Sequence, residues 1–337
     1  MNPVAHLAQL LSRPEPLLAL APMQDITDLP FWTLLAKYGG PDVYFTEYFR
    51  VHGTSGLQRE ILRSITENPT GRPAIAQMIG NDPAALARTA RELQKHPIAG
   101  VDLNLGCPAP VVYRKCAGGG LLRDLDRIDA ILGMLREAVQ INLTVKTRVG
   151  FDSISDYPRI LETIAKHSPD LVTVHGRTVR EMYGPVVHYP LIAQAAATLP
   201  CPLLANGNVD SVASARRILA ETRARGLMIG RGAIRNPWIF DQIRANFRDE
   251  PAFEPRGRDL LNYVLELYEA VKPPNLRLEA HVQKMKKYMN FIGVGLDPEG
   301  RFLYEIRRVT TERDFMQTCT RFLDHTQPAF EAAALAA

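Results

Sequence analysis

The sequence is poor in cysteine and has no long run of apolar residues. Its 337 residues include four cysteines, with no Cys-x-x-Cys pair and no histidine at zinc-finger spacing. These absences argue against a disulfide framework and a structural metal site, and reduced thiols are expected. No stretch is apolar over the length that a membrane span needs, and the N-terminus lacks the pattern of a signal peptide. We therefore expect a cytoplasmic protein without a membrane anchor or a metal.

The glycine motifs that hold phosphates in open α/β folds are also missing. No glycine lies between Leu17 and Asp25, so the first apolar run is not followed by a Gly-x-Gly-x-x-Gly turn. The run Gly118 to Gly120 has no Lys-Ser or Lys-Thr after it, which excludes a P-loop, and we interpret it as a hinge or lid. The formal net charge of +4 is too small to prove an acidic partner.

Short β-prone runs alternate with helix-period segments such as 83–93 and 128–139. The runs are nearly all apolar, as expected for parallel strands that are covered on both faces. This alternation predicts a (β/α)8 TIM barrel, and it favours the barrel over a doubly wound open sheet. The eight expected strands are Leu17–Ala21, Val43–Thr46, Ala74–Ile79, Gly100–Leu105, Leu143–Thr147, Leu171–His175, Pro202–Ala205 and Gly226–Ile229.

The pattern changes after residue 248. Prolines at 251, 255, 273 and 274 interrupt a region without strand signals, and helical segments are expected over 260–271, 276–292 and 311–325. The sequence thus predicts two domains, a barrel over residues 1–248 and a small all-helical C-terminal domain over 249–337. Nothing in the sequence determines the oligomeric state, and a monomer is the default expectation.

Polar side chains stand at the ends of the expected strands, where the loops of a TIM barrel form the active site. Asn104 and Cys107 lie in an Asn-Leu-Gly-Cys-Pro turn that carries a thiol to the rim of the sheet. A buried thiol of a core strand is the alternative, but the polar Asn104 and the proline stop argue against a continuing strand.

Two consecutive strand ends also carry glycine turns suited to a phosphate group. They are Asn206-Gly207-Asn208 and Gly230-Arg231-Gly232, where a permissive backbone and an arginine can hold an anion. Lys146, His175 and Gln77 would place a cation and hydrogen-bonding groups on the same ligand. This combination suits a flavin, whose reduced ring carries negative charge at one edge.

The motif series resembles that of the dihydrouridine synthases. It comprises, in the family order, Ala21-Pro22-Met23, Asp102-Leu103-Asn104-Leu105-Gly106-Cys107-Pro108, Val145-Lys146-Thr147-Arg148, Val174-His175-Gly176-Arg177-Thr178, Ala205-Asn206-Gly207 and Met228-Ile229-Gly230-Arg231-Gly232-Ala233. The motifs span most of the barrel, and the helical tail is similar to the family's RNA-binding domain. At position 208, where relatives often have an acidic residue, this chain has asparagine.

The resemblance implies reduction of uridines in RNA, chiefly transfer RNA, by FMN that NADPH or NADH re-reduces. Hydride would pass to C6 of a flipped-out uracil, and Cys107 would give a proton to C5. Asn104 and Arg177 would contact the uridine. FMN would be held by Pro22, Met23, Gln24, Gln77, Lys146, His175, Asn206, Gly207, Asn208, Gly230 and Arg231.

The tail shows a pattern expected for RNA binding. Residues 277, 281, 284 and 288 recur at helical spacing on one face, and apolar residues occupy the adjoining face. The predicted RNA-binding residues are Arg277, His281, Lys284, Lys287 and Tyr288. The alternatives are a flavoenzyme acting on a small pyrimidine, a dihydrouridine synthase acting on ribosomal RNA, and an inactive RNA-binding relative.

Overall fold

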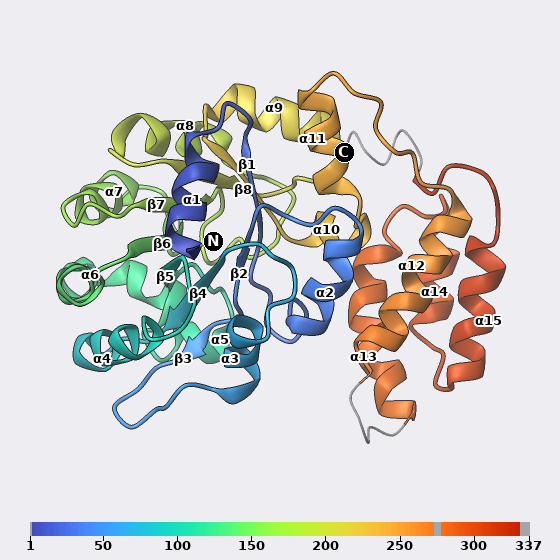
Figure 1. Cartoon of the computed structure of the whole chain (residues 1–337), viewed down its shortest axis with the longest axis horizontal. Coiled ribbons are helices and arrows are strands. Elements are labelled where there is room, and N and C mark those ends of the chain that lie inside the picture. The colour runs from blue at the N-terminus through green and yellow to red at the C-terminus, as the bar shows by residue number, and fades with distance from the viewer. Residues whose placement is uncertain (1, 273–277, 331–337) are drawn as a thin grey trace. The chain divides into compact units, whose positions relative to one another are not determined.

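The computed structural model describes residues 2–272 and 278–330, and it confirms the predicted TIM barrel. Eight of the nine strands of the sheet pair in parallel and form a closed ring (Figure 1). The strands of the ring are β1 (Leu17–Leu20), β2 (Val43–Phe45), β4 (Ala74–Ile79), β5 (Gly100–Leu105), β6 (Asn142–Arg148), β7 (Leu171–His175), β8 (Leu203–Asn206) and β9 (Gly226–Ile229).

The predicted strands agree with the observed ones to within one residue at each end, because each is apolar on both faces and ends in turn residues. A short strand that was not predicted, β3 (Phe49–Arg50), pairs with β4 outside the ring. The helices between the ring strands are α2 (Leu29–Lys37), α3 (Arg59–Thr66), α4 (Pro83–Leu93), α5 (Pro110–Tyr113), η1 (Gly118–Arg123), α6 (Leu125–Ala138), α7 (Tyr157–Ala165), α8 (Tyr189–Thr198) and α9 (Val212–Thr222).

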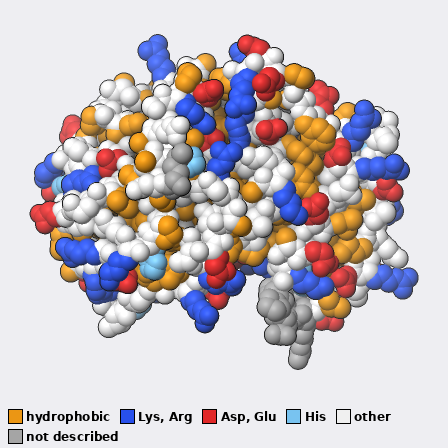
Figure 2. Space-filling model, in the orientation of Figure 1, with side chains coloured by type: hydrophobic (Ala, Val, Ile, Leu, Met, Phe, Trp, Pro, Cys, Tyr) orange, Lys and Arg blue, Asp and Glu red, His pale blue; other side chains and the backbone are white. Residues whose placement is uncertain are grey.

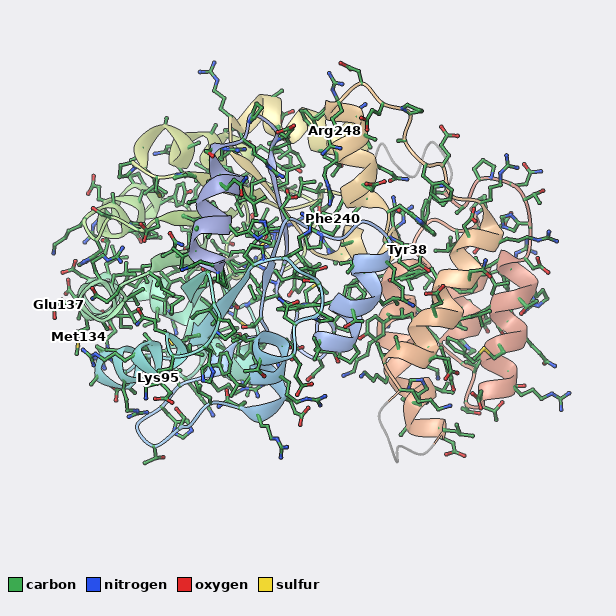
Figure 3. All side chains as sticks on the ribbon, viewed as in Figure 1. Tyr38, Lys95, Met134, Glu137, Phe240 and Arg248 are labelled. Carbon is green, nitrogen blue, oxygen red and sulfur yellow. The ribbon has the colours of Figure 1, made fainter. Side chains whose placement is uncertain are left out.

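Helices α4 and α6 each begin after an aspartate that satisfies a free amide group of the first turn. Asp82 accepts a hydrogen bond from the Ala85 amide at 3.0 Å, and Pro83 follows it at the first helical position of α4. Asp124 caps α6 in the same way, at 3.0 Å from the Arg127 amide. Helices such as α4 and α6 lie outside the sheet, and Lys95, Met134 and Glu137 on this side point away from the strands (Figure 3).

By their contacts the residues fall into two compact units, each described here by itself. The first unit, residues 1–29, 41–209 and 216–229, contains all strands of the sheet. The second unit comprises residues 30–40, 210–215 and 230–337. It holds α10 (Arg231–Arg235), α11 (Ile239–Phe247), α12 (Gly257–Ala270), α13 (Leu278–Ile292), α14 (Arg301–Ile306) and α15 (Glu312–Leu323). The predicted domain boundary at residue 248 stays a prediction.

The helices expected in the tail are found as α12, α13 and α15, whereas Leu276 and Arg277 lie outside the described residues. The six-residue α14 was not predicted, because it is too short to show a helical period. Within the described ranges, no helix has both the length and the apolar composition needed to cross a membrane. Positive and negative side chains are interspersed over the face seen in Figure 2.

Helix α1 (Pro3–Ser12) packs against one end of the barrel. Its Leu7 and Leu10 belong to one buried cluster with side chains from inside the ring, among them Leu17, Ile75 and Met228. Because these partners stand early in their strands or inside the ring, α1 fills the amino-terminal end of the barrel. The carboxyl ends of the strands are left for the functional residues.

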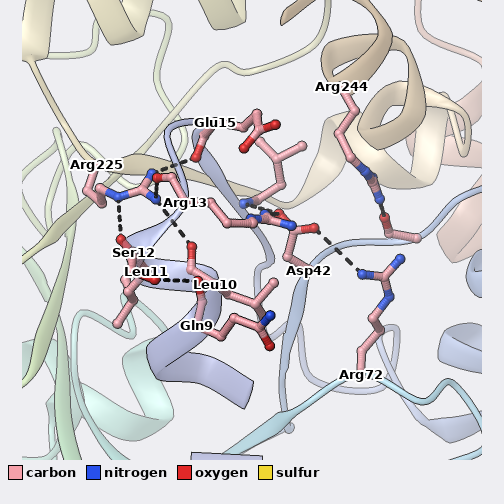
Figure 4. Close-up of polar contacts among 12 residues, drawn as sticks. Gln9, Leu10, Leu11, Ser12, Arg13, Glu15, Asp42, Arg72, Arg225 and Arg244 are labelled. Atoms are coloured by element: carbon pink, nitrogen blue, oxygen red, sulfur yellow. Dashed lines mark hydrogen bonds and ion pairs between the residues drawn. The ribbon is translucent and has the colours of Figure 1, made fainter. Parts of the chain in front are cut away.

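Arg225 fastens the C-terminus of α1 to the strand that closes the ring (Figure 4). Its guanidinium donates to the carbonyl oxygens of Leu11 at 2.9 Å, Leu10 at 3.2 Å and Glu15 at 2.7 Å. Carbonyl groups in the last turn of a helix have no partner within the helix, so a fixed cation beside them satisfies them. Asp42, which is 1% exposed, accepts from the Leu18 amide and from Arg13 at 3.0 Å each.

We expect Arg225→Ala to lower the free energy of unfolding by about 1.5–3 kcal/mol, because several carbonyl groups lose a charged donor. Chemical denaturation followed by circular dichroism measures this change. Arg127→Ala, at an exposed position of α6, is the matched control and should change stability by less than about 0.5 kcal/mol. Equal stabilities of the two variants would contradict the fastening role of Arg225.

Candidate functional site

The barrel brings the predicted ligand-binding residues of the first unit to one end of the sheet. All ring strands are parallel, so their carboxyl ends meet at the same side. The pairing places Asn104 beside Lys146 and His175 beside Asn206. Pro22, Met23 and Gln24 follow β1 directly, and Gly207 and Asn208 follow β8. Gly230 and Arg231 stand at the start of α10 in the second unit.

The turn that carries Cys107 is held at every backbone polar group of Gly106 and Cys107. Asn104 Oδ1 accepts from both amides, each at 2.9 Å. Arg148 Nε donates to the Gly106 carbonyl at 2.8 Å, and the Gly119 amide donates to the Cys107 carbonyl at 3.2 Å. A backbone without unsatisfied groups has one well-defined conformation, so the thiol is delivered to a fixed place.

The glycine run beside this turn is packed, which corrects its interpretation as a hinge or lid. Gly118, Gly119 and Gly120 are buried and open the 3-10 helix η1. A Cβ atom on Gly119 would lie 2.9 Å from the Cys107 carbonyl oxygen, and one on Gly120 would lie 2.5 Å from the Tyr113 carbonyl oxygen. Only glycine allows the backbone to approach the cysteine turn so closely. The sequence shows permissive residues here but not the atoms that they approach.

Burial raises the pKa of the Cys107 thiol above its ordinary value. The Ala109 amide, the cations of Lys146 and Arg148 and the Tyr48 hydroxyl oppose this rise without cancelling it. The thiol therefore keeps its proton at neutral pH. A protonated, half-buried thiol can donate a proton but is a poor nucleophile.

A row of polar side chains crosses three neighbouring strands beneath the cysteine turn. Gln77 on β4, Asp102 on β5 and Thr144 on β6 are paired in register. Gln77 Nε2 donates to Asp102 Oδ2 at 2.7 Å, and Thr144 Oγ1 donates to Asp102 Oδ1 at 2.5 Å. Asn104 Nδ2 donates to Gln77 Oε1 at 2.7 Å. Burial raises the pKa of Asp102 to about 6, although the Thr144 and Gln77 hydrogen bonds and Lys146 lower it.

Lys146 projects from β6 toward Asn206 on β8, and Nζ donates to Asn206 Oδ1 at 3.4 Å. The Asn206 amide is oriented by its own hydrogen bond to the Met228 carbonyl, at 2.8 Å. Burial and the nearby Arg148 lower the pKa of Lys146 to about 8. Lys146 is therefore mostly an ammonium ion at pH 7 and becomes neutral as the pH rises through 8.

Arg177 fixes the tautomer of His175, and Arg177 also donates to Asn208. Arg177 Nη1 lies 3.0 Å from His175 Nε2, and a guanidinium can only donate, so Nε2 accepts and the ring proton sits on Nδ1. Arg177 Nη2 donates to Asn208 Oδ1 at 2.9 Å. The oxygen of an acidic side chain could accept the same bond from Arg177. Asparagine can therefore replace an acidic residue at position 208 without loss of this contact. Arg177 itself is fully buried.

Glu47, after β2, holds the loop that follows β1. Gln24 Nε2 donates to Glu47 Oε2 at 3.4 Å, and the Ile26 amide donates to Glu47 Oε1 at 3.3 Å. Burial, with Asp28 and Asp25 nearby, raises the pKa of Glu47 to about 7. Gln24 Oε1 is buried without a hydrogen-bond partner within the part of the chain that the structure describes. The sequence analysis assigned no role to Glu47. Its place just after an expected strand, where the other candidate site residues stand, could have identified it.

In the tail, the structure corrects two of the predicted RNA-binding residues. His281 and Tyr288 are fully buried in the second unit, where His281 Nε2 contacts the Tyr268 carbonyl at 2.8 Å and Tyr288 stacks on Phe31 at 6.0 Å. The helical period places them on the packed side, and the sequence did not tell that side from the exposed one. Lys284 is partly buried, Lys287 is exposed, and Arg277 lies outside the described residues.

Tyr304 is an exposed aromatic residue of the tail that the sequence analysis missed. It is 61% exposed on α14, and the Arg308 guanidinium lies 3.5 Å from the centre of its ring. Arg307 Nε donates to Asn290 on α13 at 2.7 Å, which joins this surface to the helix that carries Lys287. We call Lys287, Tyr304, Arg307 and Arg308 the α13–α14 surface.

The chain is similar to proteins of one family over most of its length. A model of the dihydrouridine synthase family (Dus) matches residues 19–327. A probable tRNA-dihydrouridine synthase of Helicobacter pylori is 36% identical over 239 residues, which cover 70% of this chain and 72% of that protein. The tRNA-dihydrouridine(16) synthase of Cupriavidus necator is 34% identical over 243 residues, or 70% of this chain and 76% of that protein.

Among solved structures, histamine dehydrogenase from Rhizobium sp. 4-9 aligns with a TM-score of 0.56 at 12% identity. The alignment covers 93% of this chain and 63% of that chain, and at this identity it supports the barrel fold alone. The family match extends over most of the chain, and the relatives are similar over more than two thirds of their own length. This chain is a member of the dihydrouridine synthase family.

Proposed function

We propose that this protein reduces uridines in transfer RNA to 5,6-dihydrouridine, with FMN as its cofactor and NADPH or NADH as the reductant. Family membership and the names of the relatives support the reaction and the RNA class. The observation that carries the proposal is the Cys107 turn. It presents a protonated thiol at the barrel end that also gathers Lys146 and His175.

The residues around this end fit a flavin. Gln24 Oε1 is a buried acceptor without a partner among the described residues, and the His175 Nδ1–H is a donor. The Lys146 ammonium matches the negative charge of a reduced ring. Gln77 Nε2 donates one hydrogen to Asp102, and its second hydrogen is the one proposed for the flavin. Pro22, Met23, Asn206, Gly207 and Asn208, with Gly230 and Arg231, complete the set that we propose for FMN. When bound, reduced FMN would supply the hydride for C6 of the uracil.

Cys107 is the proposed proton donor to C5. A thiol whose pKa is raised by burial holds its proton at neutral pH, yet it is far more acidic than a hydroxyl group. Asn104 Oδ1 already accepts two amides, and Nδ2 uses one hydrogen on Gln77. Asn104 would therefore meet the uracil as a donor, through its second Nδ2 hydrogen. Arg177, which the resemblance gives as a uridine contact, is fully buried and donates to His175 and Asn208, so its proposed role is to orient these two FMN-binding residues.

A uracil stacked inside an RNA helix cannot reach a residue at the end of a barrel, so the nucleotide has to be extruded. We propose that the helical domain over residues 249–337 holds the RNA in place, with Lys284 and the α13–α14 surface facing the phosphates. Arginine and lysine contacts to phosphate position an RNA without reading its sequence, and an exposed tyrosine can stack on an unpaired base.

We expect Cys107→Ala to keep its flavin but to lose dihydrouridine formation by roughly 100-fold or more, because general acid catalysis contributes about that much. Dihydrouridine in tRNA and ribosomal RNA from a deletion strain, complemented with each variant, is measured by mass spectrometry. Cys116→Ala, at an exposed thiol, is the control and should behave like wild type. Full activity of Cys107→Ala would remove the thiol from the mechanism. Restoration in ribosomal RNA alone would replace tRNA as the substrate.

We expect FMN affinity of the apoprotein to weaken as the pH rises through about 8, because Lys146 loses its charge there. Quenching of flavin fluorescence measures this affinity across the pH range. Lys146→Gln should bind FMN more weakly at pH 7 and should show no such decline. The same pH dependence in both proteins, or a wild-type apoprotein that takes up no FMN, would contradict the assignment.

We expect Lys287→Ala and Arg308→Ala each to weaken tRNA binding about equally for all tRNAs. Each should reduce the slope of log Kd against log salt by about 1, the effect of one lost phosphate contact. Flavin content should not change, since neither residue is among those proposed to hold FMN. Arg127→Ala on α6 removes the same charge from the barrel and serves as the control. Salt slopes that match wild type would exclude the α13–α14 surface as an RNA contact.

A further inference from the structure

Asp102 has no role in the reaction as proposed above, yet it is a fully buried carboxyl group three hydrogen bonds away from the Cys107 amide. Its links run from Asp102 to Gln77, from Gln77 to Asn104, and from Asn104 to the amides of Gly106 and Cys107. Every distance in this chain lies between 2.7 and 2.9 Å. We call these residues the Asp102 chain.

The Asp102 chain can run in only one direction. At one end the Gly106 and Cys107 amides can only donate, so Asn104 must turn its oxygen toward them and its nitrogen toward Gln77. At the other end an ionised carboxylate can only accept, so Gln77 must turn its nitrogen toward Asp102 and its oxygen toward Asn104. The two ends impose the same orientation on both amide side chains.

A Gln77 side-chain amide rotated by half a turn, with its oxygen and nitrogen exchanged, would disrupt the cysteine turn. Its nitrogen would then face Asn104, whose oxygen would have to leave the two backbone amides to meet it. Both amides would lose their acceptor inside a buried region, which is costly. A neutral group at position 102 that could donate as well as accept would tolerate this reversal, whereas a carboxylate does not. The charge at position 102 therefore stabilises the conformation in which the thiol is delivered.

We propose that Asp102 is a positioning residue for Cys107, acting through Gln77 and Asn104, and this inference rests on the proposed role of Cys107 as proton donor. The same chain fixes which atoms Gln77 and Asn104 present at the barrel end. The Asp102 carboxylate thus fixes the position of Cys107 and the orientation of the Gln77 and Asn104 side-chain amides.

The fold itself does not benefit from this charge. Burial raises the pKa of Asp102 to about 6 in the folded protein, above that of an exposed aspartate. A group with a raised folded pKa binds protons more tightly when folded, so its contribution to stability falls as the pH rises from about 4 to about 6. At neutral pH the ionised carboxylate is a cost to folding, which is expected of a group retained for function.

The test compares Asp102→Ala and Asp102→Asn with Thr144→Val. Thr144→Val removes the other hydrogen bond to the same carboxylate but lies off the chain to Cys107. In stopped-flow measurements on the flavin-loaded enzyme, reoxidation of the reduced flavin by tRNA should slow roughly 10–100-fold in Asp102→Ala, the range for a misplaced group. Reduction by NADPH should stay within about twofold, because the thiol takes no part in it. Asp102→Asn is neutral and can also donate, so it tolerates the reversed Gln77 amide and should recover only part of the loss. Thr144→Val keeps the carboxylate and the Asp102 chain, and it should match wild type at a pH well above the pKa of Asp102.

A second measurement needs no turnover. Alkylation of each cysteine by iodoacetamide is followed by peptide mass spectrometry, with the exposed Cys116 as the internal reference. A loosened turn exposes the half-buried thiol, so Cys107 should react several-fold faster relative to Cys116 in Asp102→Ala and at the wild-type ratio in Thr144→Val. An unchanged ratio in Asp102→Ala would overturn the proposal. A wild-type enzyme that forms no dihydrouridine would defeat the proposed function instead, while the alkylation ratio still decides the positioning role.

If Asp102→Ala does not fold, the pH dependence of the flavin reoxidation rate tests the proposal instead. Gln77 and Thr144, which contact Asp102 from β4 and β6, do not titrate, and Lys146 is the charged group that acts on it among the described residues. Below about pH 6 the protonated carboxyl group can donate, so the wild-type reoxidation rate should fall there. Asp102→Asn has no proton to gain and should lack this decline. An identical acidic decline in both proteins would contradict the proposal.

Discussion

The pair of hydrogen bonds that Asn104 accepts from the Gly106 and Cys107 amides is the constraint on which the site depends. A thiol can protonate one particular carbon atom only if its backbone does not move, and this backbone has no unsatisfied polar group. The turn is held from below by Asn104, from the side by Arg148 and from the adjoining loop by Gly119. The proposed protonation of the uracil by Cys107 depends on the position of this turn.

The barrel makes that constraint possible because it puts residues from distant parts of the sequence into one register. Gln77, Asp102 and Thr144 come from three strands and form one row, and Asn104 and Lys146 form another row nearer the rim. Helix α1 occupies the opposite end of the ring, where Arg225 holds its last carbonyl groups. One end of the barrel is therefore devoted to packing, and the other carries groups whose pKa values are shifted by burial.

Some errors of the sequence interpretation have a common physical origin. A helical period in the tail showed that two faces exist, yet His281 and Tyr288 turned out to be packed and Tyr304 exposed. Histidine and tyrosine have both an apolar body and a polar tip, so either environment suits them. The glycine run at 118–120 indicated permissive backbone, but only its neighbours reveal that the run is pressed against the cysteine turn.

The barrel could be predicted from the amino-acid sequence, because apolar strands of regular spacing and capped helices are local patterns that need no knowledge of their partners. The sequence also identified Cys107, Lys146 and His175 as functional candidates, since strand ends can be read from the pattern. The contacts that hold these residues in place could be seen only in the folded chain. Gln77 bonds to Asp102 and Asn104, which lie 25 and 27 positions away in the sequence, and these bonds fix the direction of the Asp102 chain. The tautomer of His175 follows from the position of the Arg177 guanidinium. Hydrogen bonds require a distance and an angle, and a linear pattern contains neither.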